Sequence, residues 1–404
     1  MMEEFKKGKS PFYPGQPVPV ELFVGRHKEI EKMIMQGVVQ VTKGKPVSFF
    51  VQGEYGIGKS SIASYVKWYA EKNYNLYGIY VSLGGCKTLD DLAKAVLEST
   101  VQSGVFDSRR SEKFKNFLAK YIRKQDVFGF SINLEALKQD APNLSSPFGM
   151  LNFLAAVKER LQEDGVQGLM LILDELNGIT GNESFACFVK GLIDTNAMQK
   201  EPLPLFLILG GVEERRREMI QKHQPVDRLF DIIDIVPMQK EEMQNFFKKA
   251  FESVQIKVTP EAMNLFTKYS AGFPKIMHLI GDNAYWFDKD GVIDEEDAGE
   301  ALVAAASDVG KKYIDQQVIK ALRSPDYHSI LTKIASLGPA CISFKKTDLE
   351  SGLTEPEKRK FSNFLQRMKK LNVLKSGDFQ GEYLVILRMA QLYIWLERGQ
   401  RKEA

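Results

Sequence analysis

Short apolar runs alternate with amphipathic segments through the first 240 residues. Apolar runs with the length of buried parallel strands cover 47–52, 76–83, 169–173 and 205–209, and a fifth is predicted at 232–236. Apolar residues at helical spacing lie between them; in 59–72, for example, Ile62, Val66 and Tyr69 share one face. Strands that alternate with helices predict a mostly parallel sheet covered on both faces.

Beyond Lys240 the strand pattern stops, and a small helical domain is predicted. Its helices are expected near 240–253, 259–270, 275–287 and 294–306. The second of them has a good start signal, with Thr259 as N-cap and Pro260 at the first helical position.

A third unit begins near Ser324-Pro325. Helices are predicted near 327–336, 346–351 and 355–371, and two strand-like runs follow at 373–375 and 383–387, joined by a turn with Gly377, Asp378 and Gly381. A last helix at 389–397 is expected to dock onto this pair of strands.

Two segments do not fit the alternating pattern. Residues 10–21 carry four prolines and no periodicity, which predicts an extended arm on the surface of the first domain. Residues 106–148 combine a charged helical part, a hairpin pattern at 127–132 and a loop rich in proline and serine, so we interpret them as an insertion. The expected domains are an α/β domain with its arm at 1–238, a helical domain at 239–323 and a third domain at 324–404.

Composition narrows the function classes only slightly. The 404 residues are 44% hydrophobic, enough for a sizeable core and roughly two or three domains. A net charge of +3 does not by itself identify a nucleic-acid-binding protein. Three cysteines far apart and four scattered histidines argue against a disulfide framework, a zinc site or a histidine metal cluster. Without an apolar leader or a membrane-length apolar run, we expect a cytoplasmic protein with no membrane partner.

The first predicted strand runs directly into a phosphate-binding motif. The pattern GxxxxGK[ST] is matched without a mismatch by Gly53-Glu54-Tyr55-Gly56-Ile57-Gly58-Lys59-Ser60, and Ser61 follows. Glycines let successive backbone N–H groups point inward at an anion, and the helix that begins near Lys59 directs its positive dipole end at the phosphates. In this motif Lys59 reaches the β- and γ-phosphates of a nucleoside triphosphate, and the Ser60 hydroxyl is a ligand of Mg²⁺.

Two carboxylates follow the buried strand LMLIL. Asp174 lies where that strand meets the edge of the sheet at which α/β proteins bind ligands, so it is the second predicted Mg²⁺ ligand. Its neighbour Glu175 is the candidate general base that polarises an attacking water.

These motifs on this strand pattern resemble the AAA+ superfamily, and more narrowly the origin-recognition and STAND-type P-loop ATPases. Before the phosphate loop, the residues from Phe23 to Ile30 are similar to the FVGRxxEI box of that group. The resemblance implies that Val24, Gly25 and Arg26 help to bind adenine, so the nucleotide would be ATP or ADP. It also implies that the helical domain is the AAA+ lid.

In the lid, Gly272-Phe273-Pro274-Lys275 resembles the sensor-2 motif, which implies that Lys275 lies near the γ-phosphate with Pro274 beside it. The chain departs from the family pattern after the fourth strand, where Gly210-Gly211 stands in place of a polar sensor-1 residue. For the arginine finger that reaches a neighbouring subunit's site, Arg228 is the candidate, and three consecutive arginines at 215–217 compete with it.

The third unit resembles a winged helix-turn-helix domain. Its third helix carries a local excess of basic residues, which suits contacts with the phosphates of double-stranded DNA. The candidate DNA contacts on this helix are Lys358, Arg359, Lys360 and Arg367.

The sequence therefore predicts an ATPase whose nucleotide state changes DNA binding or self-association through its winged helix. Two alternatives remain open. One is a signalling or defence ATPase whose winged helix contacts protein. The other is a nearly inactive nucleotide-binding scaffold, which the missing sensor-1 residue favours.

Overall fold

The computed structural model describes residues 7–102 and 143–402, apart from single positions at 17, 321, 323, 339, 340, 342, 372, 378 and 387. The predicted hairpin at 127–132 lies outside these residues. The chain divides into two compact units, Pro17–Val236 and a second one made of Met1–Gln16 with Pro237–Ala404. We call them the α/β unit and the C-terminal unit.

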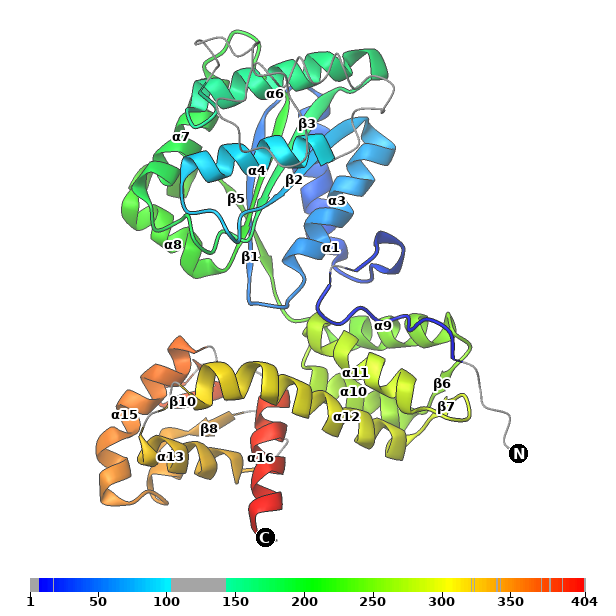
Figure 1. The fold of residues 1–404 in the computed structure, drawn as a ribbon, viewed down its shortest axis with the longest axis vertical. Helices are drawn as coiled ribbons and strands as arrows, with labels where there is room; N and C mark the ends of the chain where they lie inside the picture. Colours follow the sequence, from blue (N-terminus) through cyan, green and yellow to red (C-terminus); the bar gives the residue numbers. More distant parts are fainter. Residues whose placement is uncertain are drawn as a thin grey trace, which may run out of the picture. The chain divides into compact units, whose positions relative to one another are not determined.

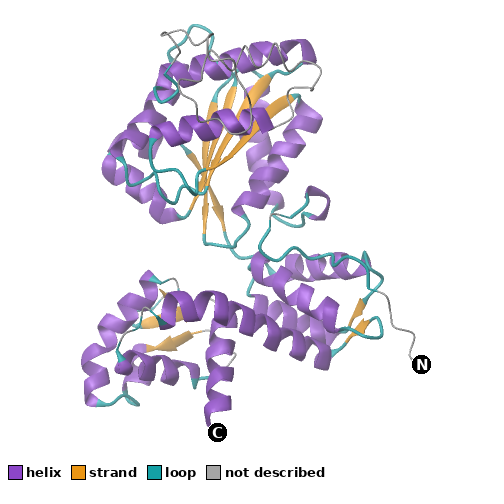
Figure 2. Cartoon of the chain, in the orientation of Figure 1, coloured by secondary structure: helices purple, strands orange, loops and turns teal. Residues whose placement is uncertain are grey.

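A five-stranded parallel sheet forms the centre of the α/β unit (Figure 2). Its strand order is β2-β3-β4-β1-β5, and the strands are β1 (Val47–Gly53), β2 (Leu76–Ser82), β3 (Gly168–Asp174), β4 (Leu205–Gly211) and β5 (Asp231–Ile235). All four pairings are parallel. The five strands predicted from the apolar runs are thus confirmed.

Helices cover both faces of this sheet, as predicted (Figure 1). The continuous apolar core on one face is built by α4 (Leu89–Gln102), α6 (Pro147–Leu161), α7 (Glu183–Ala197) and α8 (Glu213–Lys222). The other face is covered by α3 (Lys59–Tyr74) with η2 (Met33–Val38) and α2 (Val39–Thr42). Short elements complete the unit: η1 (Val20–Leu22), α1 (His27–Lys32), η5 (Gln162–Asp164) and η6 (Gln224–Arg228).

The C-terminal unit begins with the four predicted helices. They are α9 (Lys240–Glu252), α10 (Pro260–Ser270), α11 (Pro274–Phe287) and α12 (Glu295–Val309), and the last continues as the π-helical segment η7 (Gly310–Ile319). Thr259 caps α10 by accepting a hydrogen bond from the Ala262 N–H at 3.3 Å, as its position before Pro260 predicted. Two short parallel strands that the sequence did not signal, β6 (Lys257–Val258) and β7 (Val292–Ile293), join the helices.

The rest of this unit combines helices with a small antiparallel sheet. The helices are α13 (Pro325–Ala335), α14 (Lys346–Glu350), α15 (Glu355–Lys370) and α16 (Arg388–Lys402). The sheet has the order β8-β10-β9, with β8 (Ser343–Lys345), β9 (Leu374–Ser376) and β10 (Glu382–Val385). The strand β8 was missed, because three residues before a helix carry no readable alternation.

The last helix packs more widely than predicted. α16 packs against α12 and α13, with Gln391 donating to the carbonyl of Ile334 at 3.0 Å. Contact with the small sheet is also present, since Ile394 lines an apolar cavity together with Leu374 of β9 and Val385 of β10.

The first part of the predicted arm, residues 10–16, belongs to the C-terminal unit and the rest to the α/β unit, so the prediction that the whole arm lies on the α/β domain is wrong. Phe12 is 4% exposed, and its ring packs 4.8 Å from that of Phe251 between centroids. Gly281 of α11 provides the space, because a Cβ there would lie 2.2 Å from the Phe12 ring. The Tyr13 N–H also donates to Nδ1 of the buried His278 at 3.1 Å. Two adjacent aromatics in a proline-rich segment give no sign of their partners, so sequence alone could not place them.

Among the described residues, no helix has both the length and the apolar character needed to cross a bilayer.

Candidate phosphate and metal site

The phosphate loop joins β1 to α3 and has the backbone conformation that its glycines allow. Gly53, Gly56 and Gly58 have φ values of 157°, 78° and 102°, a region that residues with a side chain rarely adopt. At Gly53 a side chain is also excluded by space, since a Cβ would lie 2.6 Å from the Ile235 carbonyl oxygen. The loop then enters α3 at Lys59, so the helix N-terminus faces the interior of the turn.

The remaining loop residues divide by exposure. Ile57 is 1% exposed and anchors the loop, whereas Tyr55 is 69% exposed. Glu54 and Ser61 are partly buried at the two ends of the motif. Their predicted part in nucleotide binding stays a prediction.

Lys59 is held inside the loop. Its Nζ donates to the carbonyl oxygens of Gly53 at 2.8 Å and Glu54 at 2.9 Å. Burial lowers the pKa of Lys59, while the charges of Asp174 and Glu54 raise it and partly offset that effect. A partly desolvated ammonium group inside a ring of backbone amides is suited to bind phosphate oxygens.

The two predicted metal ligands, Ser60 and Asp174, lie in contact, and their role as ligands stays a prediction. The Ser60 hydroxyl donates to Asp174 Oδ2 at 2.5 Å, although 114 residues separate them in the chain. Asp174 is 2% exposed at the end of β3. A hydroxyl oxygen and a carboxylate side by side next to a phosphate loop form a donor set that fits Mg²⁺. Ser60 and Asp174 would hold the ion.

Glu175 stands apart from Asp174 although it follows directly in the chain. Its φ is 59°, a left-handed conformation that is costly for a residue with a side chain. The carboxylate is exposed, and its Oε2 accepts a hydrogen bond from the Ser82 hydroxyl at 2.6 Å. Gly84 leaves room for it, because a Cβ there would lie 2.7 Å from Glu175 Oε2. Ser82 was not predicted, and only the pairing of β2 with β3 brings it to this position.

Gly210, the next-to-last residue of β4, lies against the carboxylate of Asp174. A Cβ on Gly210 would lie 2.3 Å from Asp174 Oδ1, closer than any two such atoms approach. The buried Asp174 carboxylate therefore occupies the space that a side chain at position 210 would need. Packing against Asp174 of β3 thus accounts for the glycine at position 210.

The residues of the FVGRxxEI-like box lie beside the loop. Val24 is partly buried and Gly25 is buried. Arg26 is 5% exposed, and its guanidinium donates to the Ile57 carbonyl of the phosphate loop at 3.1 Å and to the Val236 carbonyl. Sequence reasoning assigned Arg26 to adenine and did not anticipate these bonds to the backbone. Its predicted contact with adenine stays a prediction.

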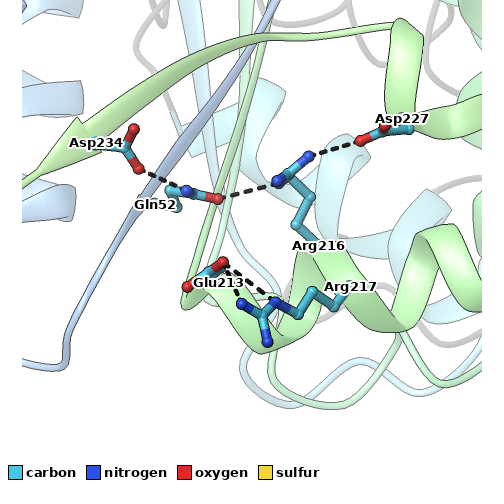
Figure 3. Close-up of polar contacts among 6 residues, drawn as sticks. All are labelled: Gln52, Glu213, Arg216, Arg217, Asp227 and Asp234. Atoms are coloured by element: carbon cyan, nitrogen blue, oxygen red, sulfur yellow. Dashed lines mark hydrogen bonds and ion pairs between the residues drawn. The ribbon is translucent and has the colours of Figure 1, made fainter. Parts of the chain in front are cut away.

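The four candidate arginines differ in their contacts. Arg215 pairs with Glu218 at 2.8 Å, and Arg217 pairs with Glu213 at 2.7 Å. Arg216 donates to Gln52 Oε1 at 3.1 Å and to Asp227 at 2.8 Å, and Gln52 in turn donates to Asp234 (Figure 3).

Arg228 differs from these three. It is exposed at the end of η6, and it makes no hydrogen bond or ion pair with the described part of the chain. An exposed cation at this place is available to a second molecule, whereas the three competitors are already paired.

The other predicted site residues lie in the C-terminal unit. Pro274 and Lys275 begin α11, where Lys275 is exposed, and its approach to the γ-phosphate stays a prediction. The four basic residues on α15 are also exposed. Two of them have acidic partners on the same unit: Lys358 pairs with Glu355 at 3.0 Å and Lys360 with Asp326 at 2.5 Å.

No protein-family model matches the chain, and no curated protein sequence does. Solved structures do match, and those compared are ATPases of the Orc/Cdc6 and Walker types. At the sequence identities found, these likenesses show a common fold.

Three of these structures match over nearly their whole length. The ORC2 protein of Aeropyrum pernix, in ADPNP–ADP complexes, has a TM-score of 0.59 at 12% identity, covering 98% of this chain and 97% of that one. The Walker-type ATPase PABY2304 of Pyrococcus abyssi has a TM-score of 0.55 at 18% identity, covering 92% and 96%. Cdc6p from Pyrobaculum aerophilum has a TM-score of 0.50 at 11% identity, covering 97% and 98%.

Proposed function

We propose that this protein is an AAA+-type ATPase that binds ATP with Mg²⁺, hydrolyses it and uses its nucleotide state as a switch. The observation that carries the proposal is the contact between Ser60, the last residue of the phosphate-loop motif, and the buried Asp174. The ATPase fold of the structural neighbours supports it.

The reaction asks little covalent chemistry of the protein, because phosphoryl transfer depends on positioning and on stabilising charge. Lys59 and the loop N–H groups would bind the β- and γ-phosphates. Mg²⁺, when bound, supplies charge neutralisation of those phosphates. Glu175, exposed beside the site, would orient the attacking water and accept its proton. Arg228 of a neighbouring copy would stabilise the charge of the transferred group.

The switch would act through the C-terminal unit. We propose that α9–α12 form the lid and that Lys275 reports the γ-phosphate, so that ATP and ADP favour different arrangements. The elements α13 to β10 would form a winged helix, in which α15 contacts double-stranded DNA. Arg359 is a stronger candidate for phosphate contacts than Lys358 and Lys360, because these two lysines must first leave their acidic partners.

A second candidate is supported by Gly210. A site with glycine at both 210 and 211 lacks a polar side chain that would orient water, so the chain would bind nucleotide and hydrolyse it very slowly. In that scaffold, ATP would act as an assembly signal. The winged helix would then contact protein, as in the signalling and defence ATPases.

Nucleotide binding is the first test. Equilibrium titration with a fluorescent ATP analogue should give Mg²⁺-dependent binding that Lys59→Ala abolishes or weakens by at least about 100-fold, since it removes the cation of the loop. Lys67→Ala is the matched control, because Lys67 is on the same helix but pairs with Glu71. Equal binding by Lys59→Ala and the parent would refute the proposal.

Hydrolysis then separates the two candidates. The switch predicts that Glu175→Gln lowers the turnover rate by about 100-fold or more while nucleotide still binds. The scaffold predicts equally low rates for both proteins.

DNA binding is tested by titration with duplex DNA over a range of salt concentrations. A DNA-binding domain predicts a steep salt slope, which Arg359→Ala should reduce by about one unit. A shallow slope, with no change in particle size or ATPase rate on adding duplex DNA, would favour a protein partner.

A further inference from the structure

One strand beside the proposed metal site carries two polar residues, Tyr80 and Ser82, that the phosphate-loop motif does not explain. They lie in the row of β2 that faces α3, together with Leu76 and Gly78, since Gly78 lies against Lys67 of that helix. The opposite row of β2, with Ile79 and Val81, is buried in the apolar core. Tyr80 is therefore a large phenol, half-buried on the side of the sheet that holds the phosphate loop.

The Tyr80 hydroxyl donates a hydrogen bond to Oδ2 of Asp174. The same oxygen accepts the Ser60 hydroxyl, and the other oxygen, Oδ1, accepts the Glu175 N–H at 2.9 Å. Both carboxylate oxygens are thus held from the protein side. Among these donors, Tyr80 alone is neither a predicted metal ligand nor part of the carboxylate pair.

The acceptor of the Tyr80 hydroxyl is a buried carboxylate, since Asp174 is 2% exposed.

We propose that Tyr80 is a positioning residue for the metal: its hydroxyl fixes the Asp174 carboxylate in the orientation that holds Mg²⁺ next to Ser60. This inference rests on the proposed function and adds a residue to its site. When Ser60 turns its oxygen to an ion, the hydrogen bond from Tyr80 remains to hold Oδ2. Residues that hydrogen-bond to a metal-ligating side chain and fix its orientation typically contribute about 10- to 100-fold to metal affinity.

Thermodynamic linkage makes this contribution measurable without turnover. The factor by which Mg²⁺ strengthens nucleotide binding equals the factor by which nucleotide strengthens Mg²⁺ binding. The quantity to measure is therefore the ratio of two dissociation constants of a fluorescent, non-hydrolysable ATP analogue, one with EDTA and one with saturating Mg²⁺. Tyr80→Phe removes one oxygen and should lower this ratio about 10-fold while the constant in EDTA stays unchanged.

The chain offers a matched control on the same strand. Tyr77 lies in the opposite row of β2 and packs against the apolar core, so Tyr77→Phe should leave the ratio unchanged. A role of Tyr80 in packing alone would lower thermal stability, or change both dissociation constants together, without changing their ratio.

A double-mutant cycle with Asp174→Asn gives a second readout. If Tyr80 acts through Asp174, then Tyr80→Phe should have no further effect on the ratio once the carboxylate is gone. A wild-type ratio near one would refute the proposed Mg²⁺-dependent function itself. A clear wild-type ratio that Tyr80→Phe leaves unchanged, or an undiminished effect in the Asp174→Asn background, would overturn only the role of Tyr80.

Discussion

The absence of a side chain at position 210 gives a sharp prediction: adding one there should damage the site. In the structure a Cβ on Gly210 would lie 2.3 Å from Asp174 Oδ1, and contacts of this kind are not found below 3.0 Å. In Gly210→Ala, the methyl group and the carboxylate must therefore separate by about 0.7 Å. Neither partner can yield easily, because Gly210 is in the middle of the sheet and Asp174 is held by hydrogen bonds at both oxygens.

The expected loss of Mg²⁺-dependent nucleotide affinity can be derived from the hydrogen bond that Gly210→Ala breaks. Oδ1 accepts the Glu175 N–H at 2.9 Å, and a displacement of about 0.7 Å takes that distance beyond hydrogen-bond range. Losing one hydrogen bond to a charged group costs about 1.5–3 kcal/mol. If that cost falls on the metal site, the Mg²⁺-dependent gain in nucleotide affinity should drop by roughly 10- to 150-fold.

The assay is the pair of dissociation constants with EDTA and with Mg²⁺, together with the hydrolysis rate. Gly211→Ala is the matched control, because a Cβ at Gly211 meets its nearest neighbour at an ordinary 3.5 Å. We expect Gly211→Ala to behave as the parent and Gly210→Ala to lose both Mg²⁺ dependence and turnover. A Gly210→Ala or Gly210→Asn protein that hydrolyses ATP faster than the parent would refute the steric explanation.

Three further predictions concern other parts of the chain. Burial lowers the pKa of His278 to about 4, so the stability that neutral His278 provides is complete above about pH 6.5 and is lost as pH falls toward 4. Between pH 7 and pH 5, the free energy of unfolding should therefore fall by about 2 kcal/mol more in the parent than in His278→Gln, as measured by denaturant titration. Burial raises the pKa of Glu357, but its hydrogen bonds, the largest from Lys333, outweigh the effect of burial and lower the pKa to about 2. Glu357→Gln should therefore lower the free energy of unfolding by about 3 kcal/mol at pH 7, measured by denaturant titration, and this difference should shrink as pH falls from 4.5 toward 2. Arg228→Ala should reduce steady-state turnover on the order of 10³-fold without weakening nucleotide binding. Arg217→Ala should leave turnover unchanged, because the Arg217 side chain is already paired with Glu213. Equal turnover rates for the two variants would exclude Arg228 as the arginine finger.

Much of the α/β unit could be predicted from the sequence because its signals are local. The strands LMLIL and LFLIL are apolar at every position, as strands buried on both faces must be, and both were placed within a residue or two of β3 and β4. The phosphate loop is likewise specified by one contiguous segment. The meeting of Ser60 with Asp174 needed only the parallel order of the strands, which the alternation with helices implied.

What could not be predicted depends on strand neighbours and on packing. Tyr80 and Ser82 read as ordinary strand residues, and only the register Ser82↔Asp174 between β2 and β3 brings them to the two carboxylates. Arg26 was assigned from a motif, and its bonds to Ile57 and Val236 depend on a loop 31 residues away and on the end of the α/β unit. Each of these contacts joins two segments, and the sequence of neither segment indicates that the other is its partner.

The crowding around Asp174 also bears on where fast hydrolysis must come from. The carboxylate is surrounded by the hydroxyls of Ser60 and Tyr80, the Glu175 N–H and the backbone of Gly210, so no side chain fits against it at position 210. Arg228, at the surface of the α/β unit, is the candidate cation for the site of a neighbouring copy. A site that depends on groups beyond its own sheet should turn over slowly as a single copy. We therefore expect the turnover rate per molecule to rise with protein concentration, and a rate independent of concentration would exclude a second copy as the source of the missing charge.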